Sequence, residues 1–306
     1  MEKHTFPNFF IIGAPKSGTT AISEYLRTHP NVFFSDPKEP GYFATDFKFR
    51  LVSNDRKYLR LFKDVDESKH CAVGEGSTNY LFSKTAVSNI ERFHNGPKFI
   101  VMIRNPIDMV LSFHNQQLIT GNENLISFSD AWQAEEDRSR GKRIPLTNKD
   151  PQLLLYSKWG MLGTQLLKLF DQVERKRVLV ILFDDFIQDP GLIYREVLSF
   201  LSIVDDNRQY FPVLNKGRSI EHVLPKKIHN LLLYLWMPFR THLLNGQGSG
   251  LGDWVLKMFT SEGKKEVSED IFMMLSDFYS DEVKILEDIF QHDFSKWLEK
   301  NDFKAT

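Results

Sequence analysis

Near the start of the sequence, a glycine-bounded segment carries residues that could bind a phosphate: Gly13-Ala14-Pro15-Lys16-Ser17-Gly18-Thr19-Thr20. It follows the apolar run Phe9–Ile12, and an apolar run, a glycine-rich turn and a helical pattern in this order predict strand, loop and helix. Such a loop offers backbone N–H groups and a helix N-terminus to a phosphate. The glycines have the spacing of a Walker A loop, but Thr19 stands where a nucleoside triphosphatase carries its lysine. The lysine is instead Lys16, so we predict a phosphate cradle of a different kind.

Two further groups of basic residues could bind a second phosphate. Arg104 comes directly after the apolar run Phe99–Ile103, and Ser112 lies about two helical turns further on. A forked guanidinium and a hydroxyl can hold a phosphate together. The second group is a loop with two cations around a glycine, which makes an anion clamp: Lys216, Gly217 and Arg218. Taken singly, each pattern is equally typical of ordinary surface residues.

Glu75 is the candidate general base, because it stands between two glycines at the end of a predicted strand. The glycines would leave room for a substrate, although a glutamate at a strand end is commonly just solvated. His114, on the helix after Arg104, is an outside candidate. His222 and His229 are not joined by a cysteine or a carboxylate at ligand spacing, so we predict no metal site.

The elements that must position these residues alternate between strands and helices, which predicts a parallel sheet covered on both faces. We expect an α/β fold, a P-loop-like three-layer sandwich with a central parallel sheet flanked by helices. No boundary for a second domain is visible, so residues 1–306 are expected to form a single domain with a core over about 6–220 and a C-terminal helical region over about 221–306. The expected strands are 9–12, 31–34, 72–75, 99–103 and 178–183, and the main helices are 21–29, 55–63, 83–94, 106–119, 130–138, 161–173, 190–201 and 266–300.

Composition excludes several classes of protein. The formal net charge is −1, so no basic field favours nucleic acid as a partner. Cys71 is the one cysteine, which rules out an intrachain disulfide and fits a reducing compartment. The N-terminus lacks the apolar segment of a signal peptide, and Leu231–Phe239 is too short for a transmembrane segment. We therefore expect a cytoplasmic location, and the sequence leaves the oligomeric state open.

Together, the loop Pro15–Thr20, Arg104 with Ser112, and Lys216–Arg218 resemble the sulfotransferase family that uses 3′-phosphoadenylyl sulfate (PAPS). The resemblance runs from Phe6 to about Arg218 and is nearest to the subgroup with heparan sulfate sulfotransferase domains and many bacterial relatives. Two more segments contribute to it. Lys38–Phe43 is similar to a Lys-Glu-Pro-aromatic stretch of the family, and Gly74–Tyr80 resembles the segment that carries the catalytic carboxylate. The chain departs from the pattern at Gly41, where relatives often have histidine, and at Gly76, where animal enzymes often have lysine.

The resemblance implies a role for each motif. Residues Lys16, Ser17, Gly18, Thr19 and Thr20 would cradle the 5′-phosphosulfate of PAPS. The 3′-phosphate would be held by Arg104 and Ser112, with Lys216, Gly217 and Arg218 closing over the same end. Lys16 would stabilise the leaving phosphate of the product PAP, and Glu75 would take the proton of the acceptor. The leaving phosphate is already a good one, so the chemistry requires no metal ion.

Two alternatives stay open on the residues alone. A P-loop kinase or nucleoside triphosphatase is suggested by Asp184-Asp185 after the run Val178–Phe183, which looks like a Walker B strand, although these aspartates could equally cap a helix. A non-catalytic nucleotide-binding scaffold would use the same fold.

The sequence does not identify the acceptor, which could be a hydroxyl or an amine of a glycan, a lipid or a small molecule. The basic loop 138–143 could face an anionic glycan or be merely solvated. The segment 231–260 could be a lid, part of the core or a membrane-contact surface.

Overall fold

The structure, a computed structural model, describes residues 6–94, 96–214, 218–220, 260–262 and 268–300. The chain divides into two compact units. The first contains Met1–Met109, Trp159–Asn215 and Tyr279–Trp297, and the second contains Val110–Lys158, Lys216–Phe278 and Leu298–Thr306.

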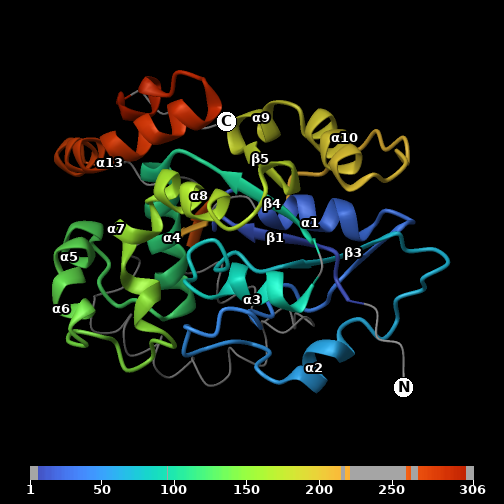
Figure 1. Ribbon diagram of the computed structural model, residues 1–306. Coiled ribbons are helices and arrows are strands. Elements are labelled where there is room, and N and C mark those ends of the chain that lie inside the picture. The colour runs from blue at the N-terminus through green and yellow to red at the C-terminus, as the bar shows by residue number, and fades with distance from the viewer. Residues whose placement is uncertain (1–5, 95, 215–217, 221–259, 263–267, 301–306) are drawn as a thin grey trace. The chain divides into compact units, whose positions relative to one another are not determined.

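A sheet of five parallel strands lies at the centre of the first unit, in the order β2-β3-β1-β4-β5 (Figure 1). The predicted α/β fold with a central parallel sheet is confirmed. Its strands are β1 (Phe9–Gly13), β2 (Val32–Phe34), β3 (Ala72–Gly76), β4 (Lys98–Ile103) and β5 (Val178–Leu182).

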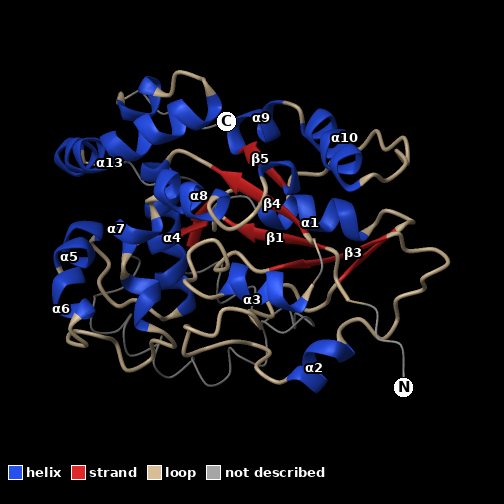
Figure 2. Cartoon of the chain, viewed as in Figure 1, coloured by secondary structure: helices blue, strands red, loops and turns tan. Residues whose placement is uncertain are grey.

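Helices cover both faces of this sheet. On one face, α1 (Thr19–Arg27) and α10 (Pro190–Leu201) bury their apolar sides against alternate strand residues such as Phe9, Ile11 and Met102. On the other face, the neighbouring residue Phe10 packs against Phe43 and against His94, which directly follows α3 (Ala86–Phe93). Figure 2 shows the strands between these helices. The alternation of strand side chains between the two faces explains why β1 is apolar throughout.

The remaining elements of the first unit follow the predicted order. They are α2 (Asp55–Arg60), α8 (Leu162–Phe170), η2 (Arg175–Arg177) and α9 (Phe183–Gln188), with the later part of α13 (Glu269–Phe290) and η3 (Ser295–Leu298). Helix α4 (Pro106–Thr120) begins as predicted, because Asn105 Oδ1 accepts a hydrogen bond from Ile107 N–H at 2.9 Å. Several boundaries differ from expectation. For example, Phe183 starts α9 instead of ending a strand, α3 starts at Ala86, the expected helix 130–138 is divided into two short helices, and the last long helix ends at Phe290.

The second unit contains most of α4 together with short helices around a buried ion pair. Arg138 Nη2 donates to Glu123 Oε1 at 2.7 Å, and Tyr156 Oη donates to Glu123 Oε2 at 2.8 Å. All three side chains are buried, so the pair is fully desolvated. The short elements are α5 (Phe128–Gln133), α6 (Glu135–Ser139), η1 (Pro151–Leu154) and α7 (Tyr156–Trp159), whose last residue belongs to the first unit.

Two short strands of the second unit lie in stretches where the sequence predicted none. They are β6 (Arg218–Ile220) and β7 (Thr260–Glu262), which pair antiparallel. The residues Lys216–Arg218 were expected to lie in a loop, and the pairing of Arg218–Ile220 with a partner far along the chain corrects this for Arg218. Short strands with little apolar alternation leave a weak local signal.

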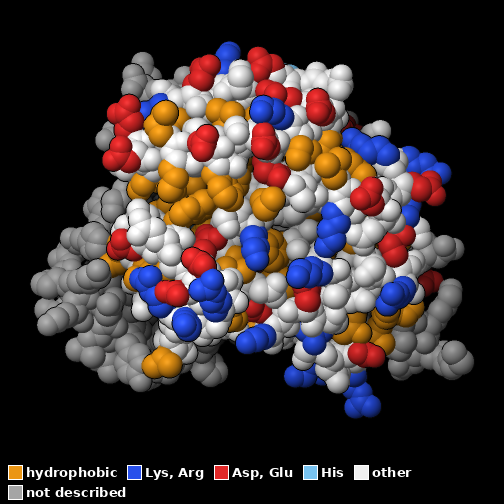
Figure 3. Space-filling model, turned by 60° about the vertical axis from the view of Figure 1, so that its left-hand side comes forward, with side chains coloured by type: hydrophobic (Ala, Val, Ile, Leu, Met, Phe, Trp, Pro, Cys, Tyr) orange, Lys and Arg blue, Asp and Glu red, His pale blue; other side chains and the backbone are white. Residues whose placement is uncertain are grey.

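The surface carries charges of both signs. On the face shown in Figure 3, Lys and Arg side chains lie among Asp and Glu side chains and form no uniform basic area, which fits the formal net charge of −1. None of the helices in the described parts of the chain is long and apolar enough to cross a membrane.

Candidate active site

The loop 13–20 joins the carboxyl end of β1 to α1 in a conformation that depends on its glycines. Gly18 has φ +85°, and a Cβ there would lie 3.1 Å from the ring of Phe183. Gly13 lies against the turn that follows β3, since an added Cβ would be 2.7 Å from Leu81 Cβ. Lys16 has φ +61°, an uncommon value for a residue other than glycine. Both glycines are therefore required by close packing at this turn.

The N-terminus of α1 opens from this loop without a side-chain cap. Gly18 occupies the N-cap position, and no side chain accepts a hydrogen bond there. The first N–H groups of a helix have no partner within the helix, and they carry the positive end of its dipole. The residues that lead into the helix are Ser17 and Thr19, both buried, and the half-buried Thr20; Ser17 Oγ donates to Pro15 O at 3.3 Å. The geometry is that of an anion-binding turn.

Arg104 reaches this loop from the carboxyl end of β4. Its Nη1 donates to Lys16 O at 3.4 Å, and its guanidinium lies 4.9 Å from the ring centre of Phe183. Its Nη2 forms an ion pair with Asp108 Oδ2 at 2.8 Å, so a bound anion would share this guanidinium with Asp108. Two motifs that are far apart in the sequence thus meet at one point.

The Lys16 side chain adds a second positive charge. Burial of its ammonium and, to a smaller extent, the charge of Arg104 lower the pKa of Lys16. Two neighbouring cations repel each other, and negative charge bound near them relieves the repulsion. Among the residues that the structure describes, no hydrogen bond or ion pair involves the Lys16 ammonium. This pair of cations beside an uncapped helix end favours binding of a phosphate or a sulfate ester.

Glu75 lies at the carboxyl end of β3, as predicted, but its side chain is completely buried. Its carboxylate accepts three hydrogen bonds: from Ser77 Oγ at 2.8 Å, from Tyr58 Oη at 2.9 Å and from Tyr80 Oη at 3.2 Å. Burial raises the pKa of Glu75 to about 7, and the three hydroxyls oppose this effect. The expected room beside the flanking glycines is occupied: a Cβ on Gly74 would lie 2.1 Å from the Phe9 ring, and one on Gly76 3.0 Å from Phe34.

Glu39 is an exposed carboxylate in the same region, and no role was predicted for it from the sequence. Its backbone N–H donates to Gly76 O at 2.8 Å, which places it beside the end of β3. Its carboxylate accepts hydrogen bonds from Thr78 N–H at 3.0 Å and from Thr78 Oγ1, and it pairs with Lys38 Nζ at 2.8 Å. These partners outweigh desolvation and lower the pKa of Glu39. The signal for this residue was its position in the Lys38–Phe43 segment, between a lysine and a proline.

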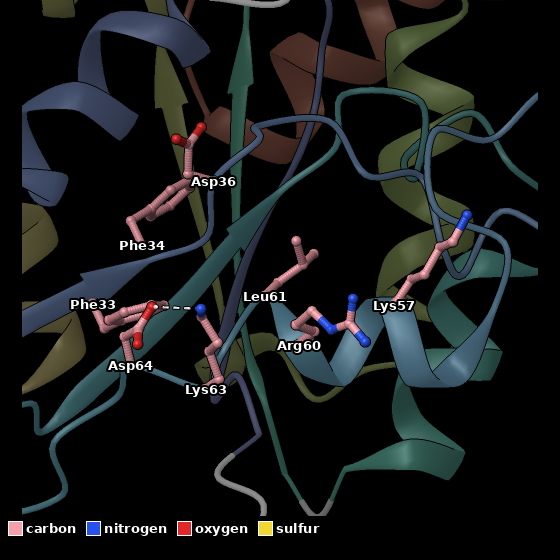
Figure 4. Close-up of a pocket in the computed structure, with 8 residues that line it drawn as sticks. All are labelled: Phe33, Phe34, Asp36, Lys57, Arg60, Leu61, Lys63 and Asp64. Carbon is pink, nitrogen blue, oxygen red and sulfur yellow. Dashed lines mark ion pairs between the residues drawn. The ribbon is translucent and has the colours of Figure 1, made fainter.

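A hollow of about 500 Å³ lies nearby, between the edge strand β2 and α2 (Figure 4). Phe33 and Phe34 line it from the strand, and Arg60 and Leu61 line it from the end of α2. The other lining residues are charged, with both signs present: Asp36, Lys57, Lys63 and Asp64. Mixed, exposed charges of this kind select no particular class of ligand.

Comparison with known protein families identifies the family of this chain. Residues 6–211, about two thirds of the sequence, match the sulfotransferase domain family. The chain is a member of this family. The match includes the loop 13–20, Glu39, Glu75, Arg104 and Ser112.

Curated relatives of this sulfotransferase are similar over part of their length. The membrane-associated sulfotransferase kil1 of Dictyostelium discoideum is 27% identical over 106 residues, which is 35% of this chain and 22% of that protein. The mouse heparan sulfate glucosamine 3-O-sulfotransferase 3B1 is 29% identical over 114 residues, which is 37% of this chain and 27% of that protein. The chain therefore matches only about a quarter of each relative.

A solved structure agrees over almost the whole chain. The sulfotransferase from Alicyclobacillus acidocaldarius superposes with a TM-score of 0.70 at 24% identity, covering 96% of this chain and all of that one. At this identity the likeness supports the fold.

The other predicted site residues of the sulfotransferase belong to the second unit or lie outside the described residues. Ser112 is half-buried on α4, and Arg218 begins β6. Lys216 and Gly217 lie outside the described residues, as do His222 and His229. The assignment of these residues to a 3′-phosphate therefore stays a prediction. His114 is buried, and its Nε2 lies 2.9 Å from Leu125 O, which fits a structural role.

Within the described ranges, no group of three or more His, Cys, Asp or Glu side chains is arranged to hold a metal ion. Asp184, which suggested a Walker B strand, lies in the first turn of α9, and its Oδ2 accepts a hydrogen bond from Trp297 Nε1 at 3.1 Å.

Proposed function

We propose that this protein transfers the sulfuryl group of PAPS to a hydroxyl or an amine of an acceptor and releases PAP. The observation that carries the proposal is the meeting of Lys16 and Arg104 at the uncapped start of α1, in a chain of the sulfotransferase family. In parallel α/β sheets, ligands bind at the carboxyl ends of the strands, and this meeting point lies at the ends of β1 and β4. We further propose that residues 1–306 work as one sulfotransferase domain.

The loop would hold the donor through its backbone. The N–H groups of residues 17–20 and the Lys16 ammonium would contact the 5′-phosphosulfate, with Ser17, Gly18, Thr19 and Thr20 shaping the turn. Arg104 would take the 3′-phosphate together with Ser112, Lys216, Gly217 and Arg218. A second anion site explains why two basic groups follow different strands of the sheet.

The reaction would be an in-line displacement at sulfur. The acceptor oxygen or nitrogen forms a bond to sulfur, the bond from sulfur to the bridging phosphate oxygen breaks, and that oxygen keeps the electron pair. Lys16 would stabilise the negative charge on this oxygen. No proton transfer to the leaving phosphate is required, since it is a weak base, and the proposal needs no metal ion.

The proton of the acceptor needs a carboxylate within hydrogen-bond reach. Glu75 was predicted for this role, and its raised pKa suits a base near neutral pH. An acceptor would, however, have to displace hydroxyls that enclose a fully buried side chain. Glu39 lies beside Glu75, is exposed and stays ionised at neutral pH. We therefore propose Glu39 as the proton acceptor and keep Glu75 as the alternative for the same experiment.

The acceptor class is proposed from the relatives. One of them is named for transfer to a heparan sulfate glucosamine, so a glycan is the first class of acceptor to test, before lipids and small molecules. The departures at Gly41 and Gly76 from the pattern of the family fall in the segments around Glu39 and Glu75, where an acceptor would approach. The cytoplasmic location stays a prediction.

A transfer assay tests the proposal. The protein is incubated with PAPS labelled in its sulfuryl group and with glycan, lipid, phenolic and amine acceptors, and the labelled product and PAP are measured. We expect transfer to at least one class, a loss of about 100-fold in kcat for Lys16→Ala, and a larger loss for Glu39→Gln than for Glu75→Gln. Transfer of phosphate from ATP with magnesium, with no use of PAPS, would show that the protein is a kinase instead.

A further inference from the structure

The segment 39–43, which carries Glu39, is attached to the rest of the site by backbone hydrogen bonds from alternate residues. Glu39 N–H donates to Gly76 O at 2.8 Å, Gly41 N–H donates to Ser77 Oγ at 3.0 Å, and Phe43 N–H donates to Tyr80 Oη at 3.2 Å. The last two bonds end on side-chain hydroxyls and not on backbone carbonyls. The position of the segment therefore depends in part on where those hydroxyls are held, beside the hydrogen bonds that its carbonyls accept from Val52, Arg50 and Asn89.

Both hydroxyls are held by Glu75. Ser77 Oγ donates to Oε1 of the carboxylate, and Tyr80 Oη donates to Oε2. Two relays thus run from one buried carboxylate, each through a hydroxyl, to the backbone of the segment 39–43. Ser77 and Tyr80 are themselves fully buried, so water does not substitute for either partner.

Tyr58 provides an internal comparison. Its hydroxyl also donates to Glu75 Oε2, at 2.9 Å, and it too is fully buried. No hydrogen bond leads from this hydroxyl to the segment 39–43 among the described residues; the ring stacks on Tyr42 at 4.1 Å between centroids instead. Removal of the Tyr58 hydroxyl costs the carboxylate a hydrogen bond without breaking a relay.

We infer that Glu75 is a positioning residue: through Ser77 and Tyr80 its ionised carboxylate fixes the segment 39–43 and with it the carboxylate of Glu39. The inference rests on the proposed function for the part that Glu39 plays in transfer. The part of the inference that concerns the position of the segment 39–43 does not depend on the proposed function.

Protonation of Glu75 would disturb the hydrogen bonds that hold the relays. An ionised carboxylate only accepts hydrogen bonds, whereas a protonated one also carries an O–H donor. All three surrounding hydroxyls donate toward it, so the hydroxyl that faces the added proton must reorient, and a relay weakens where that hydroxyl belongs to Ser77 or Tyr80. The ionisable groups that face Glu75 are Tyr58 from α2, Tyr80 from the following turn and Glu39 from the segment, with Lys38 paired to Glu39 beyond. Since burial raises the pKa of Glu75 to about 7, a relay would weaken as the pH falls through neutrality.

The first test needs no acceptor. Hydrogen exchange of the Gly41 and Phe43 amides is measured on the full-length protein at several pH values. We expect protection of at least one of the two amides to fall about tenfold or more as the pH drops below about 7. Ser77→Ala should expose the Gly41 amide and Tyr80→Phe the Phe43 amide, each by a similar factor, while Tyr58→Phe should leave both within about twofold of wild type. Equal loss of protection in Tyr58→Phe and Tyr80→Phe would overturn the inference, and so would pH-independent protection in the wild type.

The second test uses transfer. Ser77→Ala and Tyr80→Phe should lower kcat/KM for the acceptor about tenfold or more and leave the Kd of PAP within about twofold, which also shows that the variants are folded. Glu75→Gln should remove the fall in kcat/KM below pH 7. Glu75→Asp should restore part of this pH dependence. Wild-type rates in both relay variants would contradict the positioning role. A wild type without any transfer would refute the proposed function alone, since the exchange experiment would still decide the inference.

Discussion

Replacement of Glu75 by glutamine should change how the stability of the protein depends on pH. Burial raises the pKa of this carboxyl from 4.5 to about 7. The folded protein therefore holds the proton more tightly than the unfolded chain does, and this contribution to stability is complete below about pH 4.5 and lost as the pH rises through about 7. The difference between the two pKa values corresponds to about 3 kcal/mol. The side chain is fully buried, so solvent screening does not reduce the figure.

Urea unfolding of the wild type and of Glu75→Gln at pH values from 4.5 to 8 measures this contribution. Other groups titrate in both proteins, such as His94, whose pKa burial lowers to about 4, and they cancel in the difference. We expect the free energy of unfolding of the wild type, relative to the variant, to fall by about 3 kcal/mol over this range. A difference that stays constant with pH would refute the reasoning, because it would mean that Glu75 ionises as freely in the folded protein as in the unfolded chain.

Three other variants test separate parts of the structure. Lys16→Ala should lower kcat about 100-fold and weaken PAP binding less, as measured by steady-state kinetics and calorimetry; a change in KM alone would speak against a role in transfer. Gly74→Ala should destabilise the fold by about 3 kcal/mol in urea unfolding, because its Cβ would lie 2.1 Å from the buried Phe9 ring, and an unchanged midpoint would be inconsistent with this packing. Arg138→Ala should cost about 3–5 kcal/mol in the same assay, since it leaves the Glu123 carboxylate buried without its cation, and a loss below about 1 kcal/mol would show that the pair is hydrated.

The sheet and the donor loop could be predicted because their signals are local in the sequence. A continuous apolar run marks β4, and Asn105 before Pro106 marks the start of α4. The loop 13–20 combines a strand, two glycines and a helix within one stretch. Arg104 could be placed near this loop from topology alone, since parallel strands bring their carboxyl ends to one edge of the sheet.

The surroundings of Glu75 could not be predicted in this way. Its burial depends on Tyr58, which comes from α2, and on Tyr80, whose ring is turned back over the end of β3. Neither contact follows from the local pattern Gly-Glu-Gly, which by itself suggested an open site. Glu39 was hidden for a related reason, because its location is set by hydrogen bonds to Gly76 and Thr78 and not by any regular element.

The central claim is that the loop 13–20 and Arg104 recognise a donor with two separate phosphate groups, and binding of PAP measures it most directly. Calorimetry should compare PAP, adenosine 5′-phosphosulfate, which lacks the 3′-phosphate, and ATP with magnesium, on the wild type and on Lys16→Ala and Arg104→Ala. We predict that PAP binds at least about tenfold more tightly than either other nucleotide and that each variant loses about tenfold or more. Tighter binding of ATP with magnesium than of PAP would contradict the account.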